Sequence, residues 1–176
     1  YRLARERLDQ DGVLVQWLPL HGLSVDEFRI LVGTFRETFE DATLWTNVGF
    51  EPYGQVAYSL LVGTRGDLAI DPDALALRVG EPAIAAALRP WGLASAGEIL
   101  ECLHAGPETL ARWTDGLPVN TDDHPITFFV TDYTDAAPMT PDRLLEAFAP
   151  PEDRLRGLDP VLGAELDRRW NAQGLL

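Results

Sequence analysis

The feature that most constrains the fold is a short, unbroken apolar run, Val13-Leu14-Val15, which follows a turn signal at Asp11-Gly12 and ends in Gln16-Trp17. Its length and composition are typical of a buried strand. In an open α/β sheet, ligands bind outside the carboxyl ends of the strands. Since a glutamine amide offers two donors and one acceptor, Gln16 is a candidate binding residue at that edge. The alternative is that Gln16 caps a loop or faces water.

The residues around this strand predict further elements of the same sheet. A short helix is expected at residues 1–8, and a capping box of Ser24 and Glu27 begins a second helix. The apolar face of that helix repeats at helical spacing: Phe28, Leu31, Val32, Phe35 and Phe39. Strands are expected at 42–45 and 56–62. The second of these is apolar almost throughout, which favours a central or nearly central position.

The order helix, strand, helix, strand, strand is that of the last third of a methyltransferase-like Rossmann sheet, with its final two strands antiparallel at the sheet edge. Residues 1–65 are therefore interpreted as the C-terminal portion of such an α/β domain. Residues 66–176 are expected to form a mostly helical extension with a short strand near 126–130. Helix starts are predicted from caps and prolines at Asp71-Pro72, Ser95 with Glu98, Gly106-Pro107, Thr140-Pro141 and Asp159-Pro160.

The charge and cysteine content exclude several classes of function. The formal net charge is −14 and all 14 basic residues are arginines, so the basic stripe that nucleic-acid binding requires is missing. This acidity serves solubility or attracts a cationic substrate. Cys102, the one cysteine, excludes an internal disulfide. We expect it to be a buried structural thiol on an apolar helical face with Ile99, Leu100 and Leu103, in a cytoplasmic protein.

Two further stretches carry polar groups that chemistry can use. Tyr53-Gly54-Gln55 places an aromatic wall with a polar tip beside a glycine that permits close approach; the alternative is an ordinary turn before a strand. The stretch Asn120-Thr121-Asp122-Asp123-His124-Pro125 has the groups to bind a cation or to perform acid–base chemistry. Because these residues also favour turns, and the other histidines lack ligand spacing, a structural or gating turn is favoured over a metal site.

Five segments carry a resemblance to a known family: Leu3–Leu8, Gly12–Leu20, Leu44-Trp45, Pro52–Val56 and Asn120–Pro125. The fourth is similar to a Pro-Ser-Gly-Gln segment of that family, and the fifth to an Asn-Thr-Asp-Asp-Arg-Pro stretch. Through them, residues 1–130 resemble the spermidine synthase (polyamine aminopropyltransferase) family. The chain looks most like the bacterial branch that is fused behind transporter-like membrane helices.

The resemblance implies an enzyme that moves an aminopropyl group from decarboxylated S-adenosylmethionine to a diamine such as putrescine, without a metal. It implies that Gln16, Tyr53 and Gln55 bind the amine. The catalytic Asp and the Gly-rich nucleotide loop of the family have no match here, so they would lie upstream of Tyr1. The chain is therefore expected to be a C-terminal fragment that is inactive alone. A homodimer and membrane tethering through an upstream segment are left open.

Two other functions stay open at this point. One is an S-adenosylmethionine-dependent methyltransferase that acts on a small amine or another acceptor. The other is a non-catalytic, polyamine-sensing domain of a transporter fusion. An assay that compares S-adenosylmethionine with its decarboxylated form separates the two enzymes, because only the decarboxylated form can donate an aminopropyl group.

Overall fold

Four strands form one sheet in the order β1-β3-β2-β4. They are β1 (Val13–Pro19), β2 (Thr43–Thr46), β3 (Tyr58–Thr64) and β4 (Leu103–Ala105). The computed structural model describes residues 1–20, 22–46, 58–66, 70–129 and 137–147, with the single positions 160, 164 and 168. Each pair of neighbouring strands is antiparallel. Since β1 and β2 both pair with β3, they run parallel to each other on either side of it.

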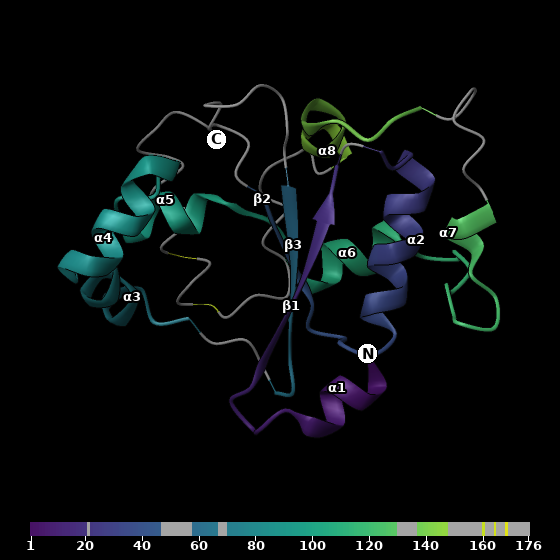
Figure 1. Cartoon of the computed structure of the whole chain (residues 1–176), viewed down its shortest axis with the longest axis horizontal. Helices are drawn as coiled ribbons and strands as arrows, with labels where there is room; N and C mark the ends of the chain where they lie inside the picture. The colour runs from purple at the N-terminus through teal and green to yellow at the C-terminus, as the bar shows by residue number, and fades with distance from the viewer. Residues whose placement is uncertain are drawn as a thin grey trace.

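One face of the sheet carries the main core. The helices α1 (Arg2–Arg7), α2 (Val25–Arg36) and α6 (Pro107–Trp113) lie on this side (Figure 1). Phe28, Phe35 and Phe39 are fully buried, and the rings of Phe35 and Phe39 stack with centroids 4.8 Å apart. Burying each such side chain contributes about 1.5–3 kcal/mol. The apolar periodicity of α2 thus fixes this helix on the sheet.

The opposite face is partly covered by four short elements: α3 (Pro72–Val79), α4 (Pro82–Leu88), η1 (Arg89–Trp91) and α5 (Ala96–Glu101). They lie on the other side of the sheet from α2 (Figure 1). Buried Leu100 and Leu103 form a second apolar cluster, against which Trp45, Ile70 and Leu75 pack. Because Trp45 belongs to β2, this cluster attaches the helical layer to the β2–β4 half of the sheet.

Most of the predicted elements are confirmed. The chain is α/β, the order of elements over residues 1–65 is as expected, and β3 lies inside the sheet. Four predicted helix starts are the starts of α3, α5, α6 and α8 (Pro141–Ala147). Ser95 and Glu98 form a capping box, as do Ser24 and Glu27. The fifth start, at Asp159-Pro160, falls largely outside the described residues.

The strand expected near 126–130 was wrong. Residues Ile126–Phe129 form a helical turn, α7, and Val130 lies outside the described residues. Asn120 Oδ1 accepts a hydrogen bond from the Thr127 backbone N–H at 3.2 Å, which satisfies a donor that the first turn of a helix leaves free. This polar contact, made from seven residues away, favours the helix over the β-branched and aromatic composition.

The helical face assigned to Cys102 also needs correction. Cys102 is the C-cap of α5, and the next residue, Leu103, begins β4. β4 pairs with β2 through Leu44 opposite Ala105 and Trp45 opposite Leu103. These contacts join segments far apart in the sequence, so the local pattern alone could not distinguish a continued helix from a strand.

β1 is an edge strand rather than the buried strand that its apolar run indicated. Val13, Val15 and Trp17 are 49%, 52% and 49% exposed. They share one face of the sheet with Tyr58 and Leu60 of β3, which are 45% and 39% exposed. We call these five side chains the open face. No described strand pairs with the outer edge of β1, and an apolar sequence cannot reveal whether such a partner is present.

Candidate functional site

Gln16 lies in the middle of β1 and not at its carboxyl end, because the strand continues to Pro19. Its side chain is half-buried on the α2 side of the sheet. Gln16 Nε2 donates to the Trp17 carbonyl at 2.7 Å. Gln16 Oε1 lies 3.5 Å from the Tyr1 hydroxyl, at the limit of a hydrogen bond. The amide oxygen is therefore held only weakly, and it can accept a hydrogen bond from a ligand.

Tyr1 is a site residue that the sequence analysis did not single out. Its ring meets Phe35 edge-on, with centroids 5.1 Å apart, and this contact places its hydroxyl beside Gln16. Burial raises the pKa of the Tyr1 hydroxyl above its ordinary value. The hydroxyl thus remains a protonated donor across the physiological range. The signal in the sequence that could have identified Tyr1 is its position on one helical face with Ala4 and Leu8.

Tyr53 and Gln55, the other two predicted amine-binding residues, lie outside the described residues. β3 begins at Tyr58, shortly after them, and Pro19 at the end of β1 is opposite Tyr58 in the sheet. It stays a prediction that Tyr53 and Gln55 share a pocket with Gln16.

The polar stretch 120–125 forms the turn that the sequence favoured. The backbones of Thr121 and His124 exchange hydrogen bonds at 3.2 and 3.1 Å, and Thr121 Oγ1 accepts from His124 N–H at 3.1 Å. The Asn120 N–H donates to Thr34 Oγ1 of α2 at 2.8 Å. Asp122 and Asp123 are exposed. These contacts give the stretch a structural role in joining α2 to α7.

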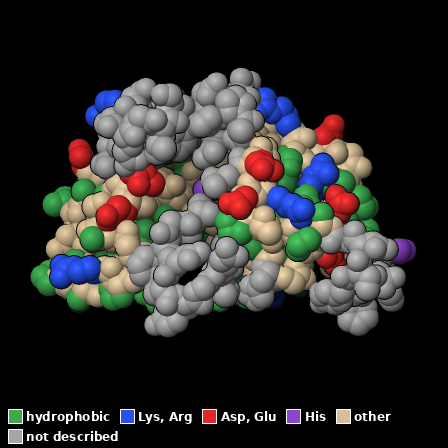
Figure 2. Space-filling model, turned by 90° about the horizontal axis from the view of Figure 1, so that it is seen from above, with side chains coloured by type: hydrophobic (Ala, Val, Ile, Leu, Met, Phe, Trp, Pro, Cys, Tyr) green, Lys and Arg blue, Asp and Glu red, His purple; other side chains and the backbone are tan. Residues whose placement is uncertain are grey.

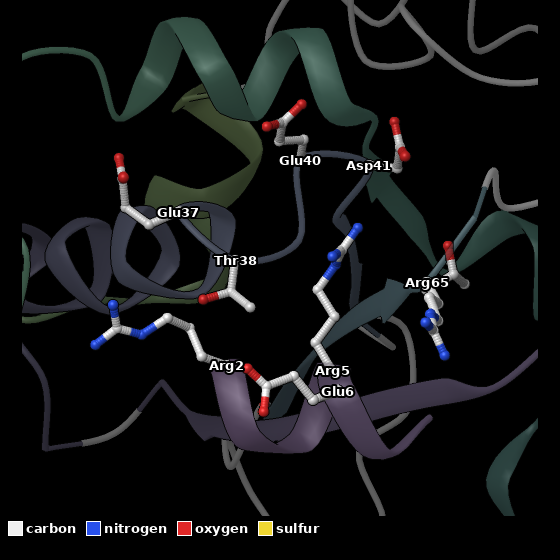
Figure 3. Close-up of a pocket in the computed structure, with 9 residues that line it drawn as sticks. Arg2, Arg5, Glu6, Glu37, Thr38, Glu40, Asp41 and Arg65 are labelled. Atoms are coloured by element: carbon white, nitrogen blue, oxygen red, sulfur yellow. The ribbon is translucent and has the colours of Figure 1, made fainter. Parts of the chain in front are cut away.

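Two surface cavities adjoin this region. One, of about 670 Å³, lies between α1, α2 and the turn, and its walls include Tyr1, Asp122 and Asp123. The other, of about 460 Å³, is a groove between α1, the turn after α2 and the end of β3. Figure 3 shows arginines and carboxylates on facing walls of this groove: Arg2, Arg5, Arg65, Glu6, Glu37, Glu40 and Asp41. Three arginines stand against four carboxylates, so the groove carries no strong charge of either sign.

The carboxyl edge of β1 is closed by the start of α2 and a second segment. The Val25 N–H donates to the Ala137 carbonyl at 3.1 Å, and the Met139 N–H donates to the Leu23 carbonyl at 2.7 Å. This segment, Ala137–Met139, therefore lies against the first turn of α2. Figure 2 looks onto this edge, where acidic and basic side chains are interspersed over the described surface.

Glu27 in that first turn is 4% exposed. Its Oε2 accepts the Ser24 N–H at 2.8 Å, and the Glu27 N–H donates to Ser24 Oγ at 3.2 Å. Its Oε1 is buried and accepts no hydrogen bond from any residue that the structure describes. The sequence predicted the capping box but gave no signal that half of the carboxylate is unused.

Cys102 has the environment of a structural thiol. Burial, with a smaller contribution from Glu101, raises its pKa to about 11. The thiol donates to the Glu98 carbonyl with the sulfur 3.4 Å from the oxygen. Because the thiolate is the nucleophilic form, Cys102 is unreactive near neutral pH.

Among the described residues, no group of three or more His, Cys, Asp and Glu side chains has the arrangement of a metal site. No helix in the described part of the chain has both the length and the apolar character needed to cross a membrane. Comparisons with protein-family models, curated proteins and solved structures found no match to this chain.

Proposed function

We propose that this chain is the C-terminal part of a spermidine synthase-like aminopropyltransferase, which transfers the aminopropyl group of decarboxylated S-adenosylmethionine to a small diamine such as putrescine. The proposal joins the family resemblance of residues 1–130 to one structural observation, the direction in which the chain crosses the sheet. The donor site lies mostly upstream of Tyr1 in this proposal, and Gln16 faces the amine.

Two helices on the same face of the sheet indicate the direction in which successive parallel strands are added. The chain leaves β1, passes through α2 and enters β2, which is parallel to β1. α1 leads into β1 from the same side of the sheet, since Tyr1 packs on Phe35 of α2. Crossover connections between parallel strands are right-handed in nearly all proteins. A strand preceding α1 would therefore lie on the side of β1 away from β2, at its unpaired edge.

Such upstream parallel strands would continue outward from β1, as the sheet proposed from the sequence requires. In the described sheet, β3 between β1 and β2 and β4 beyond β2 both run opposite to β1. The same upstream part would cover the open face of Val13, Val15 and Trp17. In open α/β sheets, ligands bind outside the carboxyl ends of the strands. The proposed sheet therefore favours a ligand site at the carboxyl end of β1.

The transfer needs few protein groups. The amine nitrogen attacks the carbon next to the sulfonium, so that a C–N bond forms, the C–S bond breaks, and the thioether leaves. One proton passes from the amine to a general base. The enzyme must hold the amine in line and remove that proton. The Gln16 amide oxygen suits the first task, and the net charge of −14 attracts a dicationic diamine.

The test is an assay of the native gene product that contains this chain, with putrescine and either decarboxylated S-adenosylmethionine or S-adenosylmethionine, followed by mass spectrometry. We expect aminopropylated putrescine only with the decarboxylated donor. We expect Gln16→Ala to lower kcat/KM for putrescine about tenfold or more while donor binding is kept. Gln10→Ala, which removes an exposed amide in the turn before β1, is the matched control.

Each contrary result has a definite meaning. Methylated putrescine with S-adenosylmethionine would replace the proposal with the methyltransferase alternative. Putrescine binding without turnover would favour the polyamine-sensing domain. Equal kinetics for Gln16→Ala and Gln10→Ala would remove Gln16 from the amine site.

A further inference from the structure

The buried carboxylate of Glu27 has one oxygen that the fold does not use. The capping box needs only Oε2, which accepts the Ser24 N–H, and a glutamine at this position would complete the box equally well. Oε1 is buried without a donor from the described residues. Buried polar atoms in native proteins almost always have a partner, and an exception calls for a ligand, an ion or water.

The second capping box of the chain shows what the motif alone requires. In α5, Glu98 Oε2 accepts from both the Ser95 N–H at 2.8 Å and the Ser95 hydroxyl at 3.1 Å. Glu98 is partly exposed, whereas Glu27 is 4% exposed. The two glutamates therefore perform the same capping role, and only Glu27 places a further carboxylate oxygen inside the protein.

We propose that Glu27 Oε1 binds the ammonium group of a small primary amine at the carboxyl edge of the sheet, beneath the segment Ala137–Met139. The identification of this amine as the diamine acceptor rests on the proposed function. The binding of an ammonium group rests on the charge and burial of Glu27 and on its place in the first turn of α2, directly after β1.

The nearby cation does not supply the missing donor. Arg29, two residues further along α2, donates Nε and Nη2 to the Trp113 carbonyl at 3.1 and 2.7 Å. Its guanidinium also lies 5.8 Å from the centre of the Trp113 ring, and its Nη1 is 3.7 Å from Asp26. Arg29 is thus directed toward α6. An ammonium group is compact and carries three donors, which suits a single free oxygen in a closed space.

Entry to Oε1 requires the segment Ala137–Met139 to move away from the first turn of α2, and buried Met139 leaves the main core with it. The backbone connection of Ala137–Met139 to the start of α2 consists of two hydrogen bonds, which together form the isolated bridge between Ser24 and Pro138. The edge on which it lies is where open α/β sheets bind ligands. When this segment lifts, the buried carboxylate becomes accessible to an amine from that side.

The experiment is calorimetric titration of the full-length native gene product with putrescine, in the absence of any donor. Glu27→Gln retains the capping box and removes the charge, and Glu98→Gln makes the same change at the matched position. We expect Glu27→Gln to weaken putrescine binding at least tenfold and Glu98→Gln to leave it unchanged. 1,4-Butanediol, an uncharged analogue of similar length, should not bind. Equal binding by the wild type and Glu27→Gln would overturn the proposal.

A second measurement covers the case in which Glu27→Gln does not fold, as judged by circular dichroism. The carboxyl carbon of Glu27 in the wild type, labelled with ¹³C, should shift on addition of putrescine but not of butanediol. An unchanged signal would overturn the proposal. The titration contains no donor, so it tests the amine site alone. Glu27-dependent putrescine binding in this titration, with no aminopropyl transfer in the separate assay with decarboxylated S-adenosylmethionine, would refute the proposed function and leave this inference standing. Aminopropyl transfer with an unchanged KM for putrescine in Glu27→Gln would support the proposed function and refute the inference about Glu27.

Discussion

Gly63 shows how closely one residue of β3 determines the packing of the main core. A Cβ at this position would lie 2.5 Å from Phe39 Cγ and 2.7 Å from Phe39 Cβ. Phe39 cannot retreat easily, because its ring stacks on Phe35. Only a residue without a side chain therefore allows the strand to pass so close to Phe39, which follows the end of α2.

We expect Gly63→Ala to lower the free energy of unfolding by about 1–3 kcal/mol, since overpacking in a filled core displaces its neighbours. Gly66→Ala is the control, because a Cβ there would meet only the Gln10 carbonyl at 3.9 Å; its effect should stay within about 0.5 kcal/mol. Urea unfolding measures both. Equal losses would show that the Phe39 contact does not matter.

For the single residue Cys102, we predict how its reactivity and its contribution to stability depend on pH. Its pKa of about 11, against an ordinary value of 9.0, leaves about 100-fold less thiolate at pH 8. Reaction with a disulfide reagent should be slower by a similar factor in the folded protein than in concentrated urea. Because the folded-state pKa is the higher one, the stability that the neutral thiol contributes is complete below pH 9 and is lost as the pH rises toward 11.

At the scale of elements, a side chain outside α7 contributes to holding its first turn. Asn120 Oδ1 accepts the Thr127 N–H, and the Asn120 N–H binds Thr34 of α2. Asn120→Ala should cost about 1 kcal/mol, as for the loss of a helix cap, and should speed hydrogen exchange of the Thr127 amide. Asp122→Ala, which alters an exposed side chain of the same turn, should change neither quantity. If both variants exchange alike, Asn120 is not the residue that holds α7.

At the scale of the whole molecule, the open face gathers five exposed apolar side chains of the described residues on one side of the sheet. Exposed apolar groups gathered on one face mark an interaction site or a risk of aggregation, and an unpaired strand edge adds to that risk. In the isolated 176-residue chain, Trp17→Lys should lower self-association and the fluorescence of a bound apolar dye.

The control for this prediction is Leu77→Lys on α3. Leu77 is 79% exposed, more than Trp17 at 49%, but it lies outside the open face. It should therefore change dye binding and light scattering much less. Equal effects of the two variants would mean that the five side chains of the open face do not act together.

The sequence predicted those elements whose signals are local. The capping boxes, the helix starts at prolines and the apolar run of β3 depend on neighbouring residues, and the structure contains these elements. β4, α7 and the exposure of β1 depend on partners distant in the chain: Leu44 for β4, Asn120 for α7, and a strand beyond the edge for β1. For the same reason the Tyr1–Gln16 contact and the unused oxygen of Glu27 could not be foreseen, since each depends on how elements pack.

The place of β3 between β1 and β2 also affects the chain during its synthesis. The ribosome must add residues 20–57 after β1 before β3 exists, which takes roughly 2–8 s at about 5–20 residues per second. Until then β1 and β2 have no strand between them to bond, and the aromatic face of α2 lacks the surface on which it packs. The nascent polypeptide is thus an early client for chaperones, and slow codons before Tyr58 would lengthen its exposure.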